Sequence, residues 1–267
     1  MKPIYFLLAL LLGSWQASAQ QSTQKTAQLL WADEFNGMGL PDSTKWSYDV
    51  GDHGWGNNEL QFYTKRDPKN ARVENGNLII EAIKDATFSK GYTSARLVTK
   101  GKGAWKYGFI EVKANLPEGL GTWPAIWMLP EVNTFGGWPK SGEIDIMEHV
   151  GYDPAIIHGT VHTEAFNHTI GTQKANQVKL PTFHSEFHVY AIDWKEDRID
   201  FYLDGDLYFT FENTGGGSKE WPFDQPFHLI LNLAVGGNWG GKYGVDSAIW
   251  PQQLVVDYVR VYDQKPD

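Results

Sequence analysis

The 267-residue sequence lacks cysteine altogether, which excludes disulfide bridges, thiolate metal sites, cysteine nucleophiles and cysteine-linked lipid anchors. It also lacks an uninterrupted apolar stretch of the ~20 residues that a membrane-spanning helix needs. Basic residues are the minority, with 23 Lys and Arg against 32 Asp and Glu and a formal net charge of −9. An acidic chain is a poor candidate for binding nucleic acid or an anionic membrane, so we expect neither as a partner.

The N-terminus has the pattern of a secretory signal peptide. Lys2 supplies the positive charge, Ile4 to Leu12 form a short apolar segment, and Ala17-Ser18-Ala19 is a cleavage site of small residues. We therefore predict a signal peptide over residues 1–19 and a secreted protein, either periplasmic or extracellular. Its removal takes away Lys2 and changes the formal charge from −9 to −10. Residues 20–28 are polar and rich in Gln, and we expect a short disordered tail there.

Residues 29–264 contain no linker, repeat or low-complexity break, so we expect one domain. Turn signals such as Asn75-Gly76 and Asp204-Gly205 separate short segments rich in strand-forming residues, and no long segment has a 3.6-residue period. This pattern predicts an all-β fold, an antiparallel sandwich. The expected strands are Asn77 to Ile83, Arg96 to Thr99, Phe109 to Ala114, Ala125 to Leu129, Gly142 to His149, Ile157 to His162, Phe187 to Trp194, Arg198 to Leu203, Leu207 to Phe211, Phe227 to Val235 and Leu254 to Tyr262.

The most informative segment is the run EIDIME at residues 143–148. Side chains of a strand alternate between two faces, so Glu143 and Asp145 share one face while the isoleucines between them point into the core. Simple alternation puts Glu148 on the opposite face. One extra residue, a β-bulge near Met147, returns Glu148 to the face of the other two acids. The pattern therefore predicts three carboxyl groups crowded on one sheet face.

Three interpretations of this acidic face are open. Carboxylate oxygens suit calcium or magnesium, although calcium loops are usually flexible turns rather than strand-like runs. An exposed polar face is a second interpretation, although such faces more often mix charges of both signs. Hydrolysis of a glycosidic bond is the third, because it needs one carboxylate as nucleophile or base and one protonated acid. Repulsion from Asp145 would raise the pKa of its neighbours and keep one glutamate protonated, so this interpretation explains the most.

The tryptophans favour a carbohydrate ligand. Trp123 and Trp127 lie four residues apart, Trp138 precedes the acidic run, and Trp239 lies in the glycine-rich segment GGNWGG. Indole faces stack on the apolar faces of sugar rings, and glycine allows a ligand to approach the backbone closely. We expect the remaining tryptophans that lack such a context to lie in the core, namely Trp31, Trp46, Trp194, Trp221 and Trp250.

The segment Gly142 to Glu148 resembles the signature of glycoside hydrolase family 16, and Trp123 to Pro130 resembles the stretch that precedes it in this family. Three further segments resemble the bacterial laminarinase branch, and Met147 fits that branch rather than the lichenases, which lack the extra residue. The resemblance implies a concanavalin-like β-jelly-roll sandwich of two antiparallel sheets with a concave cleft. It also implies internal cleavage of β-1,3-glucan with retention of configuration. The three segments are 54–63, 95–101 and 158–162.

The same resemblance assigns roles to individual residues. Glu143 would be the nucleophile, Glu148 the general acid/base, and Asp145 a residue that orients Glu143 and helps Glu148 to manage its proton. The resemblance implies that Asn58 and Arg96 hydrogen-bond to sugar hydroxyls on the non-reducing side. It implies that the indole rings stack on sugar rings at Trp123, Trp127 and Trp138. It places His162 near the acid/base on the leaving-group side. Trp239 joins this substrate-binding set through its exposed, glycine-flanked position.

Catalysis of this kind needs no cofactor, but relatives carry a structural calcium on the convex face. Glu34, Gly76 and Asp257 match its positions, mostly through backbone oxygens. We expect a monomer whose partner is a β-glucan polysaccharide or oligosaccharide. Mixed-linkage β-1,3-1,4-glucan and algal galactans remain open as substrates, because relatives hydrolyse them with the same acidic run. A non-catalytic lectin on this fold is a further alternative, although clustered acids without a role would destabilise it.

Two other motifs need an interpretation. His184 and His188 are four residues apart, but the pattern differs from the H-E-x-x-H of zinc proteases and a strand follows, so we expect a structural role. Asn167-His168-Thr169 is an N-glycosylation sequon, which has meaning only in a host that glycosylates.

Overall fold

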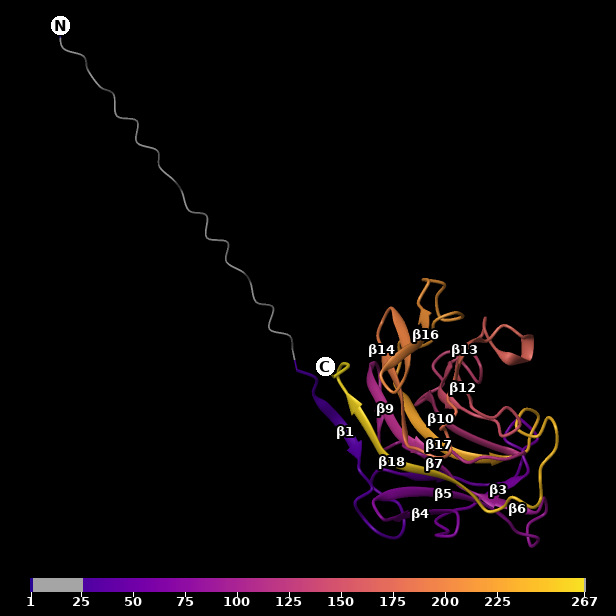
Figure 1. The fold of residues 1–267 in the computed structure, drawn as a ribbon. Coiled ribbons are helices and arrows are strands. Elements are labelled where there is room, and N and C mark those ends of the chain that lie inside the picture. Colours follow the sequence, from indigo (N-terminus) through magenta and orange to yellow (C-terminus); the bar gives the residue numbers. More distant parts are fainter. Residues whose placement is uncertain (2–25, 267) are drawn as a thin grey trace.

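The computed structural model describes Met1 and residues 26–266, so the predicted signal peptide, after Met1, and most of the tail lie outside the described residues. The described part forms eighteen strands and one short 3-10 helix in two stacked sheets (Figure 1). All eleven predicted strands are present. Within this part of the chain, no helix has the length and apolar character to cross a membrane. The all-β sandwich expected from the sequence is confirmed.

Each sheet has a long central path of neighbouring strands. The first runs β16-β15-β14-β9-β18-β5-β6-β3, with β1 beside β18 and β4 beside β5, and the second runs β13-β12-β11-β10-β17-β7-β2, with β8 beside β17. Pairing is antiparallel except between β3 and β6. The elements are β1 (Leu29–Asp33), β2 (Ser47–Asp49), β3 (Gln61–Tyr63), β4 (Ala71–Glu74), β5 (Asn77–Lys84), β6 (Tyr92–Ser94), β7 (Arg96–Val98), β8 (Ala104–Trp105), β9 (Gly108–Asn115), β10 (Thr122–Pro130), β11 (Glu143–Glu148), β12 (Ile156–His162), η1 (His168–Ile170), β13 (Lys174–Lys179), β14 (His188–Trp194), β15 (Arg198–Leu203), β16 (Asp206–Glu212), β17 (Phe227–Val235) and β18 (Gln252–Tyr262).

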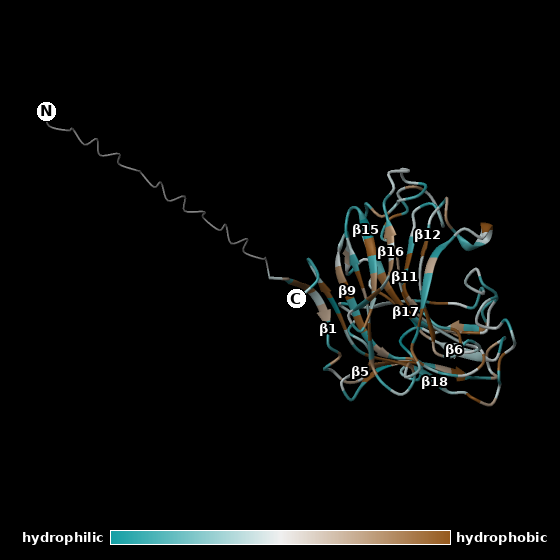
Figure 2. Cartoon of the chain, turned by 45° about the horizontal axis from the view of Figure 1, so that its top comes forward, coloured by the Kyte–Doolittle hydropathy of each residue, from teal (hydrophilic) through white to brown (hydrophobic). Residues whose placement is uncertain are grey.

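The hydrophobic core lies between the sheets. Alternate residues of β5 are buried and half-buried, as the two-residue period of a strand requires. The central strand β17 is buried along its whole length because the core covers one face and the cleft residues crowd the other. Figure 2 shows hydrophobic residues concentrated on the strands and hydrophilic ones on the connecting loops. Trp46, Trp194 and Trp221 are buried as expected, and Trp31 and Trp250 pack half-buried against the core.

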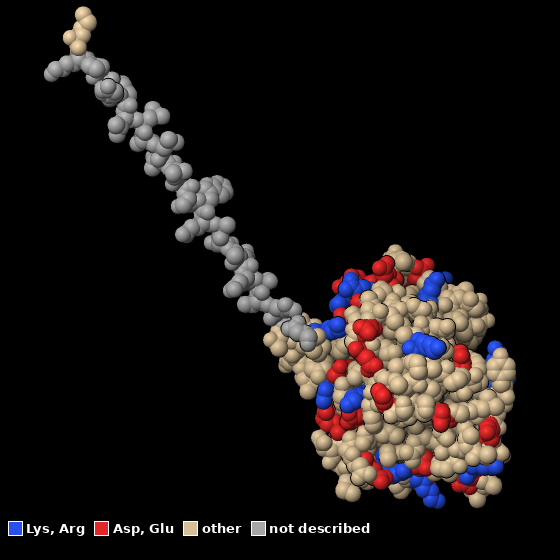
Figure 3. Space-filling model, in the orientation of Figure 1, with Lys and Arg blue, Asp and Glu red and all other residues tan. Residues whose placement is uncertain are grey.

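The ordered domain begins earlier than the sequence indicated. Gln28, assigned to the disordered tail, donates its backbone N–H to Asp263 and accepts a hydrogen bond from the Asp263 backbone. These bonds extend the pairing of β1 with the C-terminal strand β18, so both chain ends of the domain lie side by side (Figure 1). On the face shown in Figure 3, acidic and basic side chains are interspersed and form no large patch of one sign.

Candidate active site

A cleft of about 940 Å³ lies over the outer face of the second sheet. Alternate residues of adjacent strands form its floor, while the residues between them, such as Ile126 and Val161, are buried in the core. The strand period therefore sorts one sequence into a hydrophobic layer and a functional layer. The floor residues are Trp123, Ala125, Trp127 and Leu129 of β10, Glu143, Asp145 and Glu148 of β11, His158, Thr160 and His162 of β12, and Asn232 and Ala234 of β17.

The predicted bulge in β11 is present. Trp127 of β10 pairs with Asp145, and the residue before it, Ile126, pairs with Met147. Ile146 therefore has no partner on β10, and β11 has one residue more than β10 at this point. The pairing of β11 with β12 shifts at the same place. Ile146 and Met147 are both buried, and Glu148 returns to the cleft side. The bulge thus places all three carboxyl groups on one face.

Each glutamate of the acidic run accepts a hydrogen bond from a tryptophan of the cleft. The Trp138 indole N–H donates to Glu143 Oε2 at 2.9 Å, and the Trp123 indole N–H donates to Glu148 Oε1 at 3.1 Å. Asp145 is only 3% exposed, and its Oδ2 lies 3.4 Å from Nε2 of His162. The two tryptophans therefore hold the glutamates in fixed orientations and leave one oxygen of each for other contacts.

Burial raises the pKa of all three carboxyl groups. Repulsion between the acids raises the pKa of Glu143 and Asp145 further. The pKa of Glu143 rises to about 8 and that of Glu148 to about 7. The cleft therefore holds protonated carboxyl groups at neutral pH, as a reaction that begins with proton donation requires.

The surroundings of the two glutamates differ in charge. After burial, which raises both pKa values most, repulsion from Glu148 raises the pKa of Glu143 while the Trp138 hydrogen bond and the Arg96 guanidinium lower it. For Glu148 the Trp123 hydrogen bond lowers the pKa and the Glu59 carboxyl group raises it. A nearby cation favours an ionised carboxylate and a nearby acid favours a protonated one. In the free protein the repulsion from Glu148 outweighs the effect of Arg96, so the pKa of Glu143, about 8, stays above the pKa of Glu148, about 7.

Arg96 is held rigidly at the cleft floor. Its guanidinium lies over the rings of Trp55 and Trp127, 4.8 and 4.6 Å from their centroids, and its Nε is 3.0 Å from Oδ2 of Asp49. Stacking on two indole rings and one ion pair fix the plane of the guanidinium. Its charge is largely balanced within the protein, so it suits a polar neutral ligand.

Aromatic side chains also border the cleft. Trp239 meets Trp123 edge-to-face at 5.4 Å and His158 at 5.1 Å, measured between ring centroids. Trp138, 41% exposed, lies 5.0 Å from His168 of η1. The structure therefore brings Trp123, Trp127, Trp138 and Trp239 together around the acids, although they come from separate segments of the chain.

Two predicted substrate-binding residues have different positions from those expected. Asn58 is exposed and does not line the cleft, because its amide donates to Asn238 Oδ1 at 2.8 Å and links two loops of the rim. His162 was expected beside Glu148. Strand register instead pairs His162 with Glu143 and places His158 opposite Glu148. His162 therefore lies at the Glu143 end of the acidic run.

Several cleft residues were outside the predicted set. Tyr63, Asn232 and His158 reach the cleft from β3, β17 and β12, and no pattern of neighbouring residues indicates that they converge. Glu59 lies within the segment 54–63 but had no assigned role. It is buried and accepts hydrogen bonds from Gln61 and Tyr63, so it anchors this wall of the cleft.

The residues implied as calcium ligands lie where β1, β5 and β18 adjoin, on the sheet opposite the cleft. The Glu34 carboxylate is engaged by Arg260 at 2.8 and 2.9 Å, and the Asp257 carboxylate lies 2.8 Å from Nζ of Lys113. Gly76 occupies the turn between β4 and β5 with φ of 77°. With both carboxylates bound to cations, a calcium ion here would depend on backbone oxygens, in line with the resemblance.

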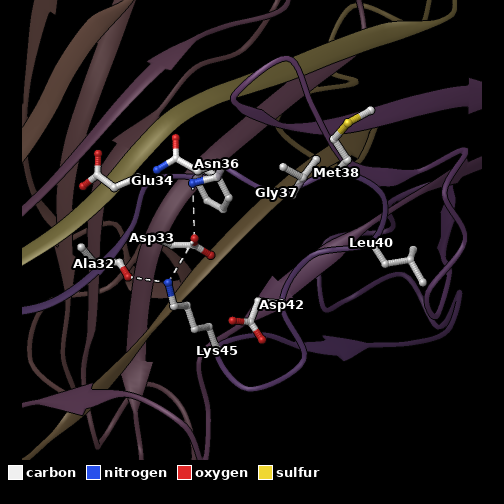
Figure 4. Close-up of a pocket in the computed structure, with 11 residues that line it drawn as sticks. Ala32, Asp33, Glu34, Asn36, Gly37, Met38, Leu40, Asp42 and Lys45 are labelled. Atoms are coloured by element: carbon white, nitrogen blue, oxygen red, sulfur yellow. Dashed lines mark hydrogen bonds and ion pairs between the residues drawn. The ribbon is translucent and has the colours of Figure 1, made fainter.

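A smaller pocket of about 370 Å³ lies beside Glu34 (Figure 4). The Lys45 ammonium donates to the Ala32 carbonyl and to the Asp33 carboxylate, which also accepts a hydrogen bond from the indole of Trp46. The buried acid of this pocket is thus already paired, and its contacts tie the end of β1 to the following loop.

The two remaining motifs are structural. His188 of β14 bridges Asp204 and Thr182 through its two ring nitrogens, at 2.7 and 2.9 Å. Asn167 is 3% exposed and its amide donates to the carbonyls of Thr163 and Glu164, while its oxygen caps η1. A side chain engaged in this way is not accessible for glycosylation in the folded protein.

Comparison with known proteins agrees with this geometry. The family model "Glycosyl hydrolases family 16" matches residues 58–260. The chain is 54% identical to a beta-glucanase of Rhodothermus marinus, over 98% of this chain and 94% of the relative. The laminarinase structure of Rhodothermus marinus superposes with a TM-score of 0.87 at 55% identity, covering 90% of this chain and 98% of that one. A non-specific endo-beta-1,3(4)-glucanase crystallised with an oligosaccharide at its active site has a TM-score of 0.85 at 49% identity, covering 90% and 95%. The chain therefore belongs to glycosyl hydrolase family 16.

Proposed function

We propose that this protein is a retaining endo-β-1,3-glucanase that cleaves laminarin-type β-glucan. The observation that carries this proposal is the bulged strand β11, which presents Glu143 and Glu148 together on the floor of an aromatic-lined cleft. The similarity to laminarinases supports the same substrate class. Hydrolysis by such a carboxyl pair requires no cofactor.

The placement of the pair on one face of the cleft suits a double displacement. Glu143, oriented by the Trp138 indole, attacks the anomeric carbon while Glu148 gives its proton to the leaving glycosidic oxygen. The ionised Glu148 then takes a proton from water, which attacks the same carbon and releases Glu143. Asp145, next to Glu143 on the same face, lies where it can orient the nucleophile and limit the charge on the pair.

The composition of the cleft supports a neutral sugar chain. Among the described residues that line it, Arg96 is the one Lys or Arg, and its charge is already paired with Asp49. A sulfated galactan would call for several free cations to meet its anionic groups. The tryptophans and the neutral polar groups of the cleft instead suit stacking on, and hydrogen bonding to, unsubstituted glucosyl rings.

Mixed-linkage β-1,3-1,4-glucan is the second candidate substrate. It is favoured by the similarity to the non-specific endo-beta-1,3(4)-glucanase. Both substrates are neutral glucans, and the same acid pair would cleave either one.

The release of reducing ends from laminarin, mixed-linkage glucan and agarose tests the proposal. We expect the wild type and the exposed control variant Glu186→Gln to release them from laminarin, and Glu143→Gln to lose at least about 10³-fold in rate. Equal activity of Glu143→Gln and the wild type would reject the assignment. That result is expected if the protein is a non-catalytic lectin and a contaminating hydrolase in the preparation releases the reducing ends. Faster hydrolysis of mixed-linkage glucan than of laminarin would favour the second candidate.

We also propose that the protein is exported and acts as a monomer. The proposal of export rests on the N-terminal pattern of Lys2, the apolar segment and Ala17-Ser18-Ala19. N-terminal sequencing of the protein recovered outside the cytoplasm should begin at Gln20, and light scattering should give the mass of one chain. Retention of Met1 in the exported protein, or a dimer mass, would contradict these proposals.

The structural calcium remains a proposal, supported by the position of Glu34 at the end of β1, Gly76 in the turn before β5 and Asp257 on β18, where these strands adjoin. A ligand that binds only the folded state raises the melting temperature with its concentration. We expect millimolar Ca²⁺ to raise the melting temperature and a chelator to reverse the effect. An unchanged melting temperature would show that Ca²⁺ does not bind.

A further inference from the structure

Three side chains at the Glu143 end of the cleft converge on a single point. One ligand-type atom from each of Glu143, Asp145 and His162 lies within 4.8 Å of the other two. Nε2 of His162 is 3.4 Å from Oδ2 of Asp145 and 3.8 Å from Oε1 of Glu143. The cross-strand pairing of Glu143 with His162 creates this arrangement, so it depends on the sheet and not on a flexible loop.

These separations fit a small tetrahedral metal ion. Zinc bonds to nitrogen and carboxylate oxygen are about 2.0–2.1 Å long, so ligand atoms of a tetrahedral site stand roughly 3.3–3.4 Å apart. The distances from His162 to the two carboxylates match this value or exceed it by a few tenths of an ångström. The ligand oxygens of Glu143 and Asp145 lie within 4.8 Å of each other, so they would need to approach by at most about 1.4 Å to complete the site.

The ligand atoms are oriented toward this point and largely unused. Oδ2 of Asp145 is buried and has no hydrogen-bond partner among the described residues, and the whole residue is 3% exposed. Trp138 binds Oε2 of Glu143, which leaves Oε1 facing His162. An ion at this point would satisfy a buried oxygen that would otherwise carry a desolvation cost.

We propose that Glu143, Asp145 and His162 bind a zinc-type transition-metal ion that competes with substrate. An imidazole nitrogen with two carboxylate oxygens suits Zn²⁺, whereas Ca²⁺ takes six to eight oxygens and Mg²⁺ keeps an octahedral shell of oxygens. Because all three ligands line the cleft, the fourth position of the ion faces the space that a sugar would occupy. The bound ion takes Oε1 of the proposed nucleophile and blocks the reaction reversibly.

Isothermal titration calorimetry of ZnCl₂ into the mature protein tests the site without turnover. We expect one strong site per chain in the wild type, no comparable heat with MgCl₂ or CaCl₂, and loss of the strong zinc site in His162→Gln. The matched control is His184→Gln, because His184 is an exposed histidine 3.6 Å from the Glu118 carboxylate and should leave the strong site intact. An unchanged strong site in His162→Gln, or its loss in His184→Gln, would overturn the proposal.

A second variant separates metal binding from folding. Asp145→Asn keeps the shape of the side chain but weakens it as a ligand, and circular dichroism at the titration temperature reports whether each variant is folded. We expect folded Asp145→Asn to lose the strong zinc site. Strong zinc binding by this folded variant would contradict the assigned ligands.

The competitive part of the inference rests on the proposed function. In the wild type, a laminari-oligosaccharide should weaken zinc binding, and Zn²⁺ should raise the KM for laminarin and leave kcat unchanged. Strong zinc binding that the oligosaccharide does not affect would contradict a site that overlaps the substrate. A wild type that binds zinc and shows no activity on any glucan would reject the proposed function and leave the metal site supported.

Discussion

Replacing the proposed nucleophile should stabilise the protein at neutral pH. Burial, together with repulsion from Glu148, raises the pKa of Glu143 from 4.5 to about 8. The folded protein therefore keeps a proton that the unfolded chain releases once the pH exceeds 4.5. The stability that this group contributes is fully present below pH 4.5 and is lost as the pH rises toward 8.

The magnitude follows from the same values. Between pH 4.5 and pH 7, the unfolded state gains about 1.4 kcal/mol per pH unit relative to a folded state that stays protonated, or roughly 3 kcal/mol in total. Glutamine has nearly the same shape and does not ionise, so Glu143→Gln avoids this loss. At pH 7 the variant should be more stable than the wild type by up to about 3 kcal/mol, or roughly 6–12 °C in melting temperature.

Urea unfolding at pH 4.5 and pH 7 measures this effect. The difference between Glu143→Gln and the wild type should be small at pH 4.5 and large at pH 7. Glu186→Gln, which changes an exposed glutamate outside the cleft, should show no such growth with pH. A Glu143→Gln variant that is equally stable or less stable than the wild type at pH 7 would refute the reasoning, because it would show that the buried carboxyl group carries no electrostatic cost.

Three other changes have defined outcomes. Glu148 must be protonated to act as an acid, so kcat of the wild type should fall as the pH rises through about 7. Glu59 raises the pKa of Glu148, so Glu59→Gln should move this fall in kcat to lower pH. A pH profile of kcat that is the same in Glu59→Gln and the wild type would contradict this role of Glu59. Arg96→Lys keeps the charge but loses the planar contact with two indole rings, so kcat/KM measured by steady-state kinetics should fall about tenfold. An unchanged kcat/KM would contradict the importance of this contact. Gly151→Ala would press a methyl group against the Gly119 carbonyl, so urea unfolding should show a loss of about 2 kcal/mol or more, whereas full stability would mean that the loop adapts freely.

Local patterns in the sequence were sufficient to predict the acidic strand and its bulge. The spacing of three acids and two isoleucines required an extra residue if all the acids were to share a face, and the structure has that bulge between Asp145 and Glu148. Strand positions followed from short apolar segments bounded by turn residues, and all eleven expected strands formed. These features depend on neighbours in the chain, which a sequence displays directly.

Features that depend on the register between strands could not be predicted from the sequence. His162 and His158 are two residues of one strand, and only the pairing of β12 with β11 decides which of them faces Glu143. Asn58 turned out to link two loops of the rim, because its partner Asn238 is distant in sequence. Glu59 influences Glu148 through space, and nothing in the adjacent residues indicates that proximity.

Covalent trapping of the nucleophile tests the central claim most directly. A 2-deoxy-2-fluoro laminaribiosyl donor with a good leaving group slows release of the glycosyl-enzyme, and peptide mass spectrometry then locates the modified residue. The account predicts one sugar per chain, attached to Glu143, with Glu148 unmodified. A label on another residue, or a folded protein that turns over laminarin without forming a covalent intermediate, would contradict it.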